Sequence, residues 1–215
     1  MKRRNVKVSG LIGSGSTVMW QMLNAVDGIN VVKEHGLLDG KATQFFHYRD
    51  FRDIVCCHAK RAPEIKKHFV KCQKEGILKS LRLFTTHSKY GFNSILKARK
   101  HGCVRLVRYE DFLPSNNEAM LQFAYDCLIY DGYDIKLDKE QLIDIASKFT
   151  IEKNYLAMPN EDNFNIHKKH LHENHISNWG MSHWKDLLDD ELKARFKKEI
   201  GKLLIEFNYE HDINW

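Results

Sequence analysis

The sequence has 215 residues, a formal net charge of +6, 43% hydrophobic residues and five cysteines. A chain of this length can bury a substantial core, and we expect residues 1–215 to form a single domain. The modest positive charge suits an anionic ligand, but it does not indicate nucleic acid because the basic residues are spread along the chain. The sequence contains no apolar run of about 18 residues, so it predicts neither a membrane span nor a signal peptide. With an odd number of cysteines and no C-x-x-C pair, we expect free thiols in a cytoplasmic protein.

The first predicted strand, residues 5–12, is joined to the first predicted helix, residues 15–26, by a glycine-rich turn. Backbone N–H groups of residues 14–17 stand at the helix N-terminus, where they lack intrahelical acceptors and the helix dipole is positive. This arrangement predicts a binding site for a phosphate or sulfate group. Three glycines allow the positive φ angles or close contacts that such a turn needs: Gly10, Gly13 and Gly15.

The turn is close to the nucleotide-binding pattern G-x-x-x-x-G-K-[ST], with one departure. Gly10 and Gly15 have the required spacing and Thr17 supplies a hydroxyl group, but Ser16 occupies the lysine position. A nucleoside triphosphate site normally needs that lysine on the β- and γ-phosphates. The departure argues against an ATPase or a kinase.

The remaining elements alternate between strands and helices. This pattern predicts an α/β fold, a three-layer sandwich whose central sheet is mostly parallel, with a P-loop-like strand–loop–helix. The segment 81–86 fits either a strand or a helix. Further strands are predicted at 29–33, 43–48 and 103–109, and helices at 50–61, 63–75, 89–101, 115–128, 138–149 and 189–207.

Charged residues follow two of these strands at the sheet edge where ligands of open parallel sheets bind. Lys33, Glu34 and His35 come at the end of the second strand, and Arg49 follows the third. An ordinary salt bridge between Arg49 and Asp53 is the structural alternative for that arginine.

Residues 150–182 have little periodicity and are rich in Asn and His, which predicts a long loop or lid. Four histidines lie within nine residues there: His167, His170, His172 and His175. Their spacing fits no metal-binding motif, so we expect no metal site.

Four segments, in this order, resemble the sulfotransferases that use 3′-phosphoadenosine 5′-phosphosulfate (PAPS). The first, Gly13-Ser-Gly-Ser-Thr17, is similar to the family's 5′-phosphosulfate loop, and residues 48–57 are similar to its 3′-phosphate motif, R-[DN]-P-x-[DE]-x-x-x-S. Residues 107–112 resemble its Y-E-D-L segment. Residues 180–185 resemble its C-terminal G-x-W-[KR] region.

The resemblance implies a role for each matching residue. Arg49 would pair with the 3′-phosphate of the donor, together with Cys57 at the position of the family's serine, and Tyr109 would lie near the adenine. Glu34 or His35 would be the general base. The loop residues Gly13, Ser14, Gly15, Ser16 and Thr17 would hold the 5′-phosphate and the sulfonate.

This sequence departs from the family at three places. Gly13 replaces the Lys or Arg that stabilises charge on the bridging oxygen, and Cys57 is a poorer hydrogen-bond donor than serine. The family's Arg-Lys-Gly triplet is not evident, although Lys168, Lys169 or the nearby histidines would suit that role. Candidates for the missing loop cation are Lys33, His175 and Arg52.

The function that these features predict is an enzyme, a PAPS-dependent sulfotransferase acting by in-line displacement on a hydroxyl or amine of a small molecule or glycan, with adenosine 3′,5′-bisphosphate (PAP) as product. It would need no metal, no nucleic acid and no membrane. One alternative is a nucleotide-dependent phosphotransferase, which would require Mg²⁺. The other is a non-catalytic protein that binds adenosine 3′,5′-bisphosphate.

Overall fold

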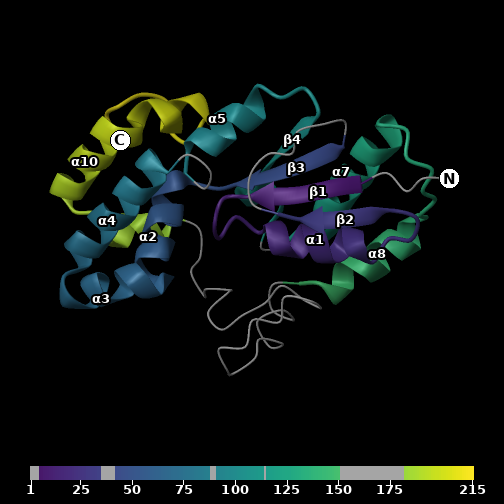
Figure 1. Cartoon of the computed structure of the whole chain (residues 1–215), viewed down its shortest axis with the longest axis horizontal. Helices are drawn as coiled ribbons and strands as arrows, with labels where there is room; N and C mark the ends of the chain where they lie inside the picture. Colours follow the sequence, from purple (N-terminus) through teal and green to yellow (C-terminus); the bar gives the residue numbers. More distant parts are fainter. Residues whose placement is uncertain (1–4, 35–41, 88–90, 114, 151–181) are drawn as a thin grey trace. The chain divides into compact units, whose positions relative to one another are not determined.

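The computed structural model describes residues 5–34, 42–87, 91–113, 115–150 and 182–215. The chain divides into two compact units, each built from two stretches of sequence. The first contains residues 1–48 and 95–176, and the second contains residues 49–94 and 177–215. Helix α5 (Asn93–Arg99) falls where the chain passes from the second unit back to the first (Figure 1). The single domain that we expect from chain length stays a prediction.

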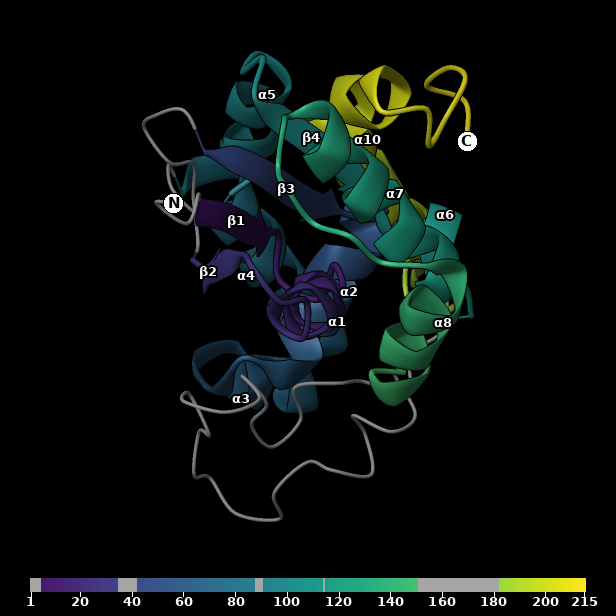
Figure 2. The same ribbon diagram turned by 90° about the vertical axis from the view of Figure 1, so that its right-hand side faces the viewer.

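A four-stranded sheet forms the centre of the first unit. Its order is β2-β1-β3-β4, and each neighbouring pair is parallel, so the α/β fold with a parallel central sheet is confirmed. Figure 2 shows the strands side by side in this order. The strands are β1 (Asn5–Gly10), β2 (Asn30–Lys33), β3 (Thr43–Tyr48) and β4 (Val104–Arg108).

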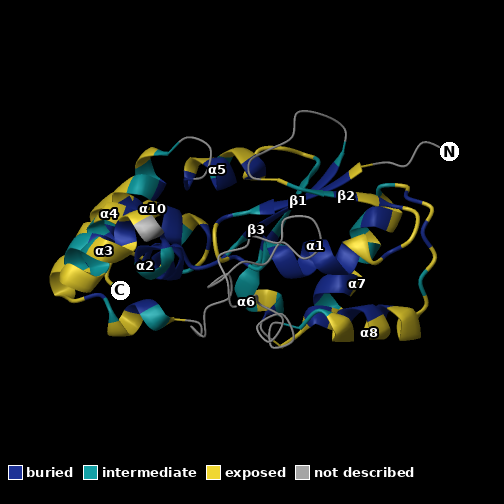
Figure 3. Ribbon diagram, turned by 60° about the horizontal axis from the view of Figure 1, so that its bottom comes forward, coloured by how far each residue is buried: buried dark blue, intermediate teal, exposed yellow. Residues whose placement is uncertain are grey.

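Helices cover one face of this sheet through a shared hydrophobic core. In register, Val8 of β1 pairs with Phe45 of β3, and both side chains are fully buried against Met19 and Met22 of α1. Figure 3 shows α1 buried along its length, whereas α8 exposes an outer side. The helices of this unit are α1 (Ser16–Asn24), α6 (Tyr109–Phe112), α7 (Asn117–Tyr130) and α8 (Lys139–Lys148).

The second unit is helical. Helix α10 buries a stripe of apolar residues at helical spacing, as its sequence predicts, and these are Leu192, Phe196, Ile200, Leu203 and Leu204. Its elements are α2 (Phe51–Arg61), α3 (Pro63–Lys71), α4 (Gln73–Thr86), the 3₁₀ helix η1 (His183–Asp186) and α10 (Asp190–Glu206).

The sequence favours side-chain caps at Ser115, Asp138 and Asp189, and two of these three are present. The side chain of Asp189 accepts from Leu192 N–H, and Asp138 forms a reciprocal capping box with Gln141. The start of α7 differs, because Asn116 rather than Ser115 has the side chain that accepts from Ala119 N–H.

Residues 81–86, which the sequence allows as either a strand or a helix, are helical and belong to α4. Ile77, Leu81 and Phe84 are buried on one side of that helix, at the three- and four-residue spacing that helical packing requires. Among the described helices, none is long and apolar enough to cross a membrane.

Candidate phosphate-binding site

The glycine-rich turn runs from β1 into α1 with the backbone geometry that the sequence predicts. Gly13 and Gly15 have φ angles of 74° and 83°, values that favour glycine. A Cβ atom on Gly15 would overlap Leu113 and lie 3.2 Å from Cδ2 of Tyr109. Gly10 is needed for close approach, because a Cβ there would lie 2.7 Å from the His47 carbonyl oxygen. Each of the three positions therefore requires glycine, because of a positive φ angle or a close contact.

The N-terminus of α1 has no side-chain cap among the described residues. Ser14 does not serve as a cap, because its buried hydroxyl donates to the Leu11 carbonyl at 2.5 Å and its amide donates to the same oxygen at 3.2 Å. Gly15 stands at the N-cap position itself and cannot supply a side chain. The first amides of α1 and the positive end of its dipole therefore form a site that suits an anion.

Lys33 brings a cation to this helix terminus. It ends β2, pairs in register with Val8, and donates a hydrogen bond from Nζ to Oγ1 of Thr17 in the first turn of α1. Burial lowers the pKa of the Lys33 ammonium to about 7, because the charged form loses hydration. A bound anion would favour that charged form, so the site is prepared to gain a proton when an anion binds.

His47 lies beneath the loop on β3. Its side chain is fully buried, its Nε2 is 3.0 Å from Sδ of Met19, and its carbonyl oxygen accepts from Leu11 N–H at 3.0 Å. Burial lowers its pKa to about 3, with a smaller opposing effect from its hydrogen bond to the Ser14 backbone. The imidazole is therefore neutral at physiological pH and supports the loop without adding charge.

Glu34, one of the two candidate bases, follows β2 and is half exposed. Its Oε2 lies 3.2 Å from Nζ of Lys7, whose side chain is only 1% exposed. The register pairs Lys7 with Val32, so Lys7 and Glu34 share the face of the sheet opposite to Lys33. The other candidate base, His35, lies outside the described residues.

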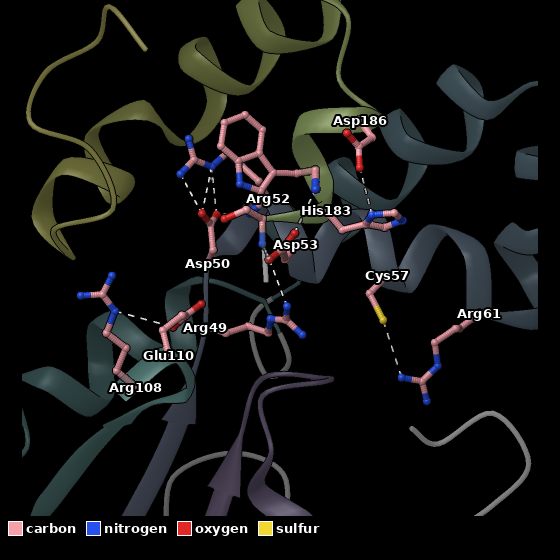
Figure 4. A network of polar contacts seen from close by, with 12 residues as sticks. Arg49, Asp50, Arg52, Asp53, Cys57, Arg61, Arg108, Glu110, His183 and Asp186 are labelled. Atoms are coloured by element: carbon pink, nitrogen blue, oxygen red, sulfur yellow. Dashed lines mark hydrogen bonds and ion pairs between the residues drawn. The ribbon is translucent and has the colours of Figure 1, made fainter. Parts of the chain in front are cut away.

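In the second unit, Arg49 is held by Asp53. Both side chains are at least 95% buried, and Nη2 of Arg49 lies 3.0 Å from Oδ2 of Asp53. The same carboxylate accepts the backbone N–H groups of Ser182 at 2.9 Å and Trp184 at 3.0 Å. The salt bridge between Arg49 and Asp53 that the sequence suggests is therefore present (Figure 4). It is buried, and it orients the guanidinium of Arg49.

Arg52, a candidate for the missing loop cation, is committed elsewhere. Its guanidinium donates to Asp50 at 2.7 Å and to Glu210, and it stacks on the rings of Trp184 and Trp215 at 3.8 and 4.5 Å. Hydrogen bonds to the two carboxylates raise its pKa against the effect of burial. This side chain stabilises the second unit, and its charge is already neutralised.

Cys57 is buried on α2 with its Sγ 3.7 Å from Nη1 of Arg61 (Figure 4). The neighbouring Cys56 is also buried, and burial raises the pKa of its thiol, which makes it unreactive. Tyr109 begins α6 and places its ring against Gly15 of the loop. Among the described residues, no group of three or more His, Cys, Asp or Glu side chains is arranged to hold a metal ion.

Within the first unit, the structure brings the predicted loop residues together with Tyr109 and Lys33. Glu34 directly follows Lys33, the last residue of β2. In the second unit, Arg49 lies just before α2, the helix that carries Cys57. Sequence reasoning missed two residues, His47 and Lys7. The sequence signal for both is a polar residue within an apolar strand, because burying an unpaired polar side chain costs free energy.

Solved structures with this fold include the mouse sulfotransferase SULT7A1 complexed with PAP. It is 10% identical to this chain with a TM-score of 0.65, and the match covers 97% of this chain and 86% of that one. Retinol dehydratase in complex with androsterone and the inactive cofactor PAP is 16% identical with a TM-score of 0.60, covering 95% of this chain and 82% of that one.

A second retinol dehydratase structure, with retinol and PAP, is 12% identical with a TM-score of 0.52 and the same coverage. No protein-family model and no curated protein sequence matches the chain. The solved structures nevertheless match nearly the whole chain. The chain therefore has the sulfotransferase fold.

Proposed function

We propose that this protein is a sulfotransferase that moves a sulfuryl group from PAPS to a hydroxyl or amine of a small-molecule or glycan acceptor. The observation that carries the proposal is Lys33 on the hydroxyl of Thr17 at the uncapped N-terminus of α1. It combines a helix dipole, backbone donors and a cation, which is the chemistry that a phosphosulfate requires. Fold likeness to two kinds of PAP-bound protein supports the same conclusion.

Lys33 is the cation that we propose in place of the family's basic residue at Gly13. Of the other two candidates, Arg52 is paired with Asp50 and Glu210, and His175 lies outside the described residues. Lys33 would stabilise the negative charge that develops on the oxygen between phosphorus and sulfur as the bond to sulfur breaks. A neighbouring loop lysine is then unnecessary.

The remaining donor contacts are proposed from the motif and supported by the local geometry. Residues 14–17 would hold the 5′-phosphate and sulfonate, and Tyr109 at the edge of the loop would lie near the adenine. Arg49, with Cys57, would hold the 3′-phosphate. Asp53 supports that role because it fixes the guanidinium of Arg49 in one orientation before any ligand binds.

PAPS, when bound, supplies an activated sulfuryl group for in-line displacement. The protein's part is to align the acceptor, remove its proton and neutralise charge on the departing phosphate. Glu34 or His35 would accept the acceptor proton. Glu34 is ion-paired with the buried Lys7 on the face of the sheet opposite to Lys33, which favours His35 as the base.

Retinol dehydratase binds androsterone and retinol in its solved structures. Both are hydroxyl-bearing apolar molecules, and we propose that the acceptor of this protein is also a small molecule with a hydroxyl group. No metal would be required, because Lys33 and the helix terminus provide the positive charge.

Calorimetric titration with adenosine 3′,5′-bisphosphate tests the proposal. We expect micromolar binding to the unmodified protein, loss of that binding in Arg49→Ala, and much weaker binding of ATP. Preference for ATP with Mg²⁺ would contradict the proposal and favour a phosphotransferase. A transfer assay with PAPS and a panel of hydroxyl acceptors separates the enzyme from a non-catalytic bisphosphate-binding protein.

A further inference from the structure

Three side chains of the second unit lie at four-residue intervals along α2, and these are Asp53, Cys57 and Arg61. Residues four apart share one face of a helix, and Arg49, just before the helix, is ion-paired with Asp53, so we call these four residues the α2 row. Two contacts join neighbouring members of the row. Arg49 and Asp53 are 3.0 Å apart, and Nη1 of Arg61 is 3.7 Å from Sγ of Cys57 (Figure 4).

Arg61 differs from Arg49 and Arg52 in the partner that it contacts. Arg49 has a buried carboxylate, and Arg52 has two carboxylates and two indole rings. The hydrogen-bond partner that the structure gives Arg61 is a thiol, which is a weak acceptor. Its guanidinium is partly exposed, and among the described residues it forms no ion pair with a carboxylate.

Arg61 also lies where the proposed 3′-phosphate subsite lacks a strong hydrogen-bond donor. Cys57 occupies the place where a serine hydroxyl would donate to the 3′-phosphate, and a thiol is a poor substitute. A terminal phosphate carries roughly −1.5 to −2 charges at pH 7 and three acceptor oxygens, which one arginine does not satisfy. Arg61 places a planar set of N–H donors next to the sulfur, where an oxyanion contacting Cys57 would meet it.

We propose that Arg61 is a second cation of the 3′-phosphate subsite and that, with Arg49, it makes the α2 row selective for a nucleotide bearing a 3′-phosphate. This inference rests on the proposed function, because it assumes that the α2 row binds the donor. The competing role for Arg61 is ordinary stabilisation, since a basic residue in the last turn of a helix interacts favourably with the helix dipole.

The experiment compares adenosine 3′,5′-bisphosphate with adenosine 5′-phosphate, which differs by the 3′-phosphate alone. We expect Arg61→Gln to weaken bisphosphate binding by roughly 10- to 100-fold, as loss of a hydrogen bond to a charged group does. Binding of adenosine 5′-phosphate should be unchanged. Lys60→Gln is the matched control, since it removes a cation from the same helical turn but from another face, and should leave both affinities unchanged.

Two further variants test the chemistry. Cys57→Ser introduces the hydroxyl donor that the subsite lacks, so in the Arg61→Gln background it should restore part of the bisphosphate affinity. Arg61→Lys keeps the charge without the planar fork and should give an intermediate affinity. It also serves as the test variant if Arg61→Gln does not fold, which thermal melting would reveal.

The outcomes separate this inference from the proposed function. Bisphosphate affinity that falls in Arg49→Ala but is unchanged in Arg61→Gln and Arg61→Lys would overturn the role of Arg61 and leave the sulfotransferase proposal standing. Equal weakening of both nucleotides would assign Arg61 a structural role and overturn it as well. An unmodified protein that does not distinguish the two nucleotides would overturn both proposals.

Discussion

Lys33, the last residue of β2, donates a hydrogen bond to the hydroxyl of Thr17 in the first turn of α1. The two residues are sixteen positions apart, and the parallel pairing of β1 with β2 brings them together. This contact places an ammonium where the sequence has no basic residue in the loop itself.

Replacing Lys33 should affect turnover more than donor binding. We expect Lys33→Met to lower kcat by roughly 10²-fold, the effect of removing one group that stabilises charge in a transition state. Lys33→Arg, which keeps the charge, should retain part of the rate. Initial-rate kinetics with PAPS would measure both variants, and an unchanged kcat in Lys33→Met would show that another cation acts at the loop.

Donor binding should depend on pH through the same side chain. The pKa of Lys33 is about 7 without ligand, and a bound anion raises it, so binding takes up a proton above pH 7. Affinity is therefore complete below pH 7 and falls as pH rises from 7 toward the raised value, by at most about tenfold per pH unit. Between pH 7.5 and 9.5 the phosphates are already ionised, so their titration does not contribute.

Calorimetry with adenosine 3′,5′-bisphosphate in two buffers of different ionisation enthalpy would count that proton directly. Lys33→Met should lose both the proton uptake and the slope, and this variant is the control. Equal slopes in the two proteins would assign the pH dependence to another group.

The base should reside in the pair that follows β2. We expect Glu34→Gln with His35→Asn to lower kcat by roughly 10²- to 10⁴-fold, the usual contribution of general base catalysis, with donor affinity retained. The two single variants locate the base. Because the ion pair with Lys7 holds Glu34 on the face of the sheet opposite to Lys33, His35→Asn should account for most of the loss. Full activity in the double variant would exclude both residues.

Gly15 should not tolerate a side chain. Gly15→Ala forces a non-glycine residue to φ near 83° and drives its Cβ into Leu113, so we expect a loss of roughly 1–3 kcal/mol in the free energy of unfolding and weaker donor binding. Gly102→Ala is the matched control, because nothing lies within 4 Å of the Cβ that it adds. Urea denaturation would measure both, and equal stability of the two variants would contradict the steric argument.

Local chemistry made parts of this protein predictable from its sequence. The loop could be predicted because glycine alone meets its positive φ angles, and the caps at Asp138 and Asp189 depend on side chains three residues away or fewer. Lys33 could be named only as one of three candidates for the loop cation, because its contact with Thr17 depends on strand register.

Arg52 illustrates what sequence could not supply. Its partners Glu210 and Trp184 lie more than 130 residues along the chain, so nothing in the local motif reveals that its charge is neutralised. Lys7 stands out as a polar residue in an apolar strand, but that position does not reveal that its partner is Glu34, which follows the neighbouring strand β2. Long-range pairing, rather than local propensity, decided these roles.

The carboxylate of Asp53 joins Arg49 to the amides of Ser182 and Trp184, which lie in the other stretch of sequence that builds the second unit. During synthesis on the ribosome, Arg49 emerges long before those amides exist. The carboxylate therefore cannot complete its hydrogen bonds until about 130 further residues have been added, and such long-range closure is slow. A nascent chain that already displays its glycine loop therefore lacks a fully anchored Arg49 until Ser182 and Trp184 have been added.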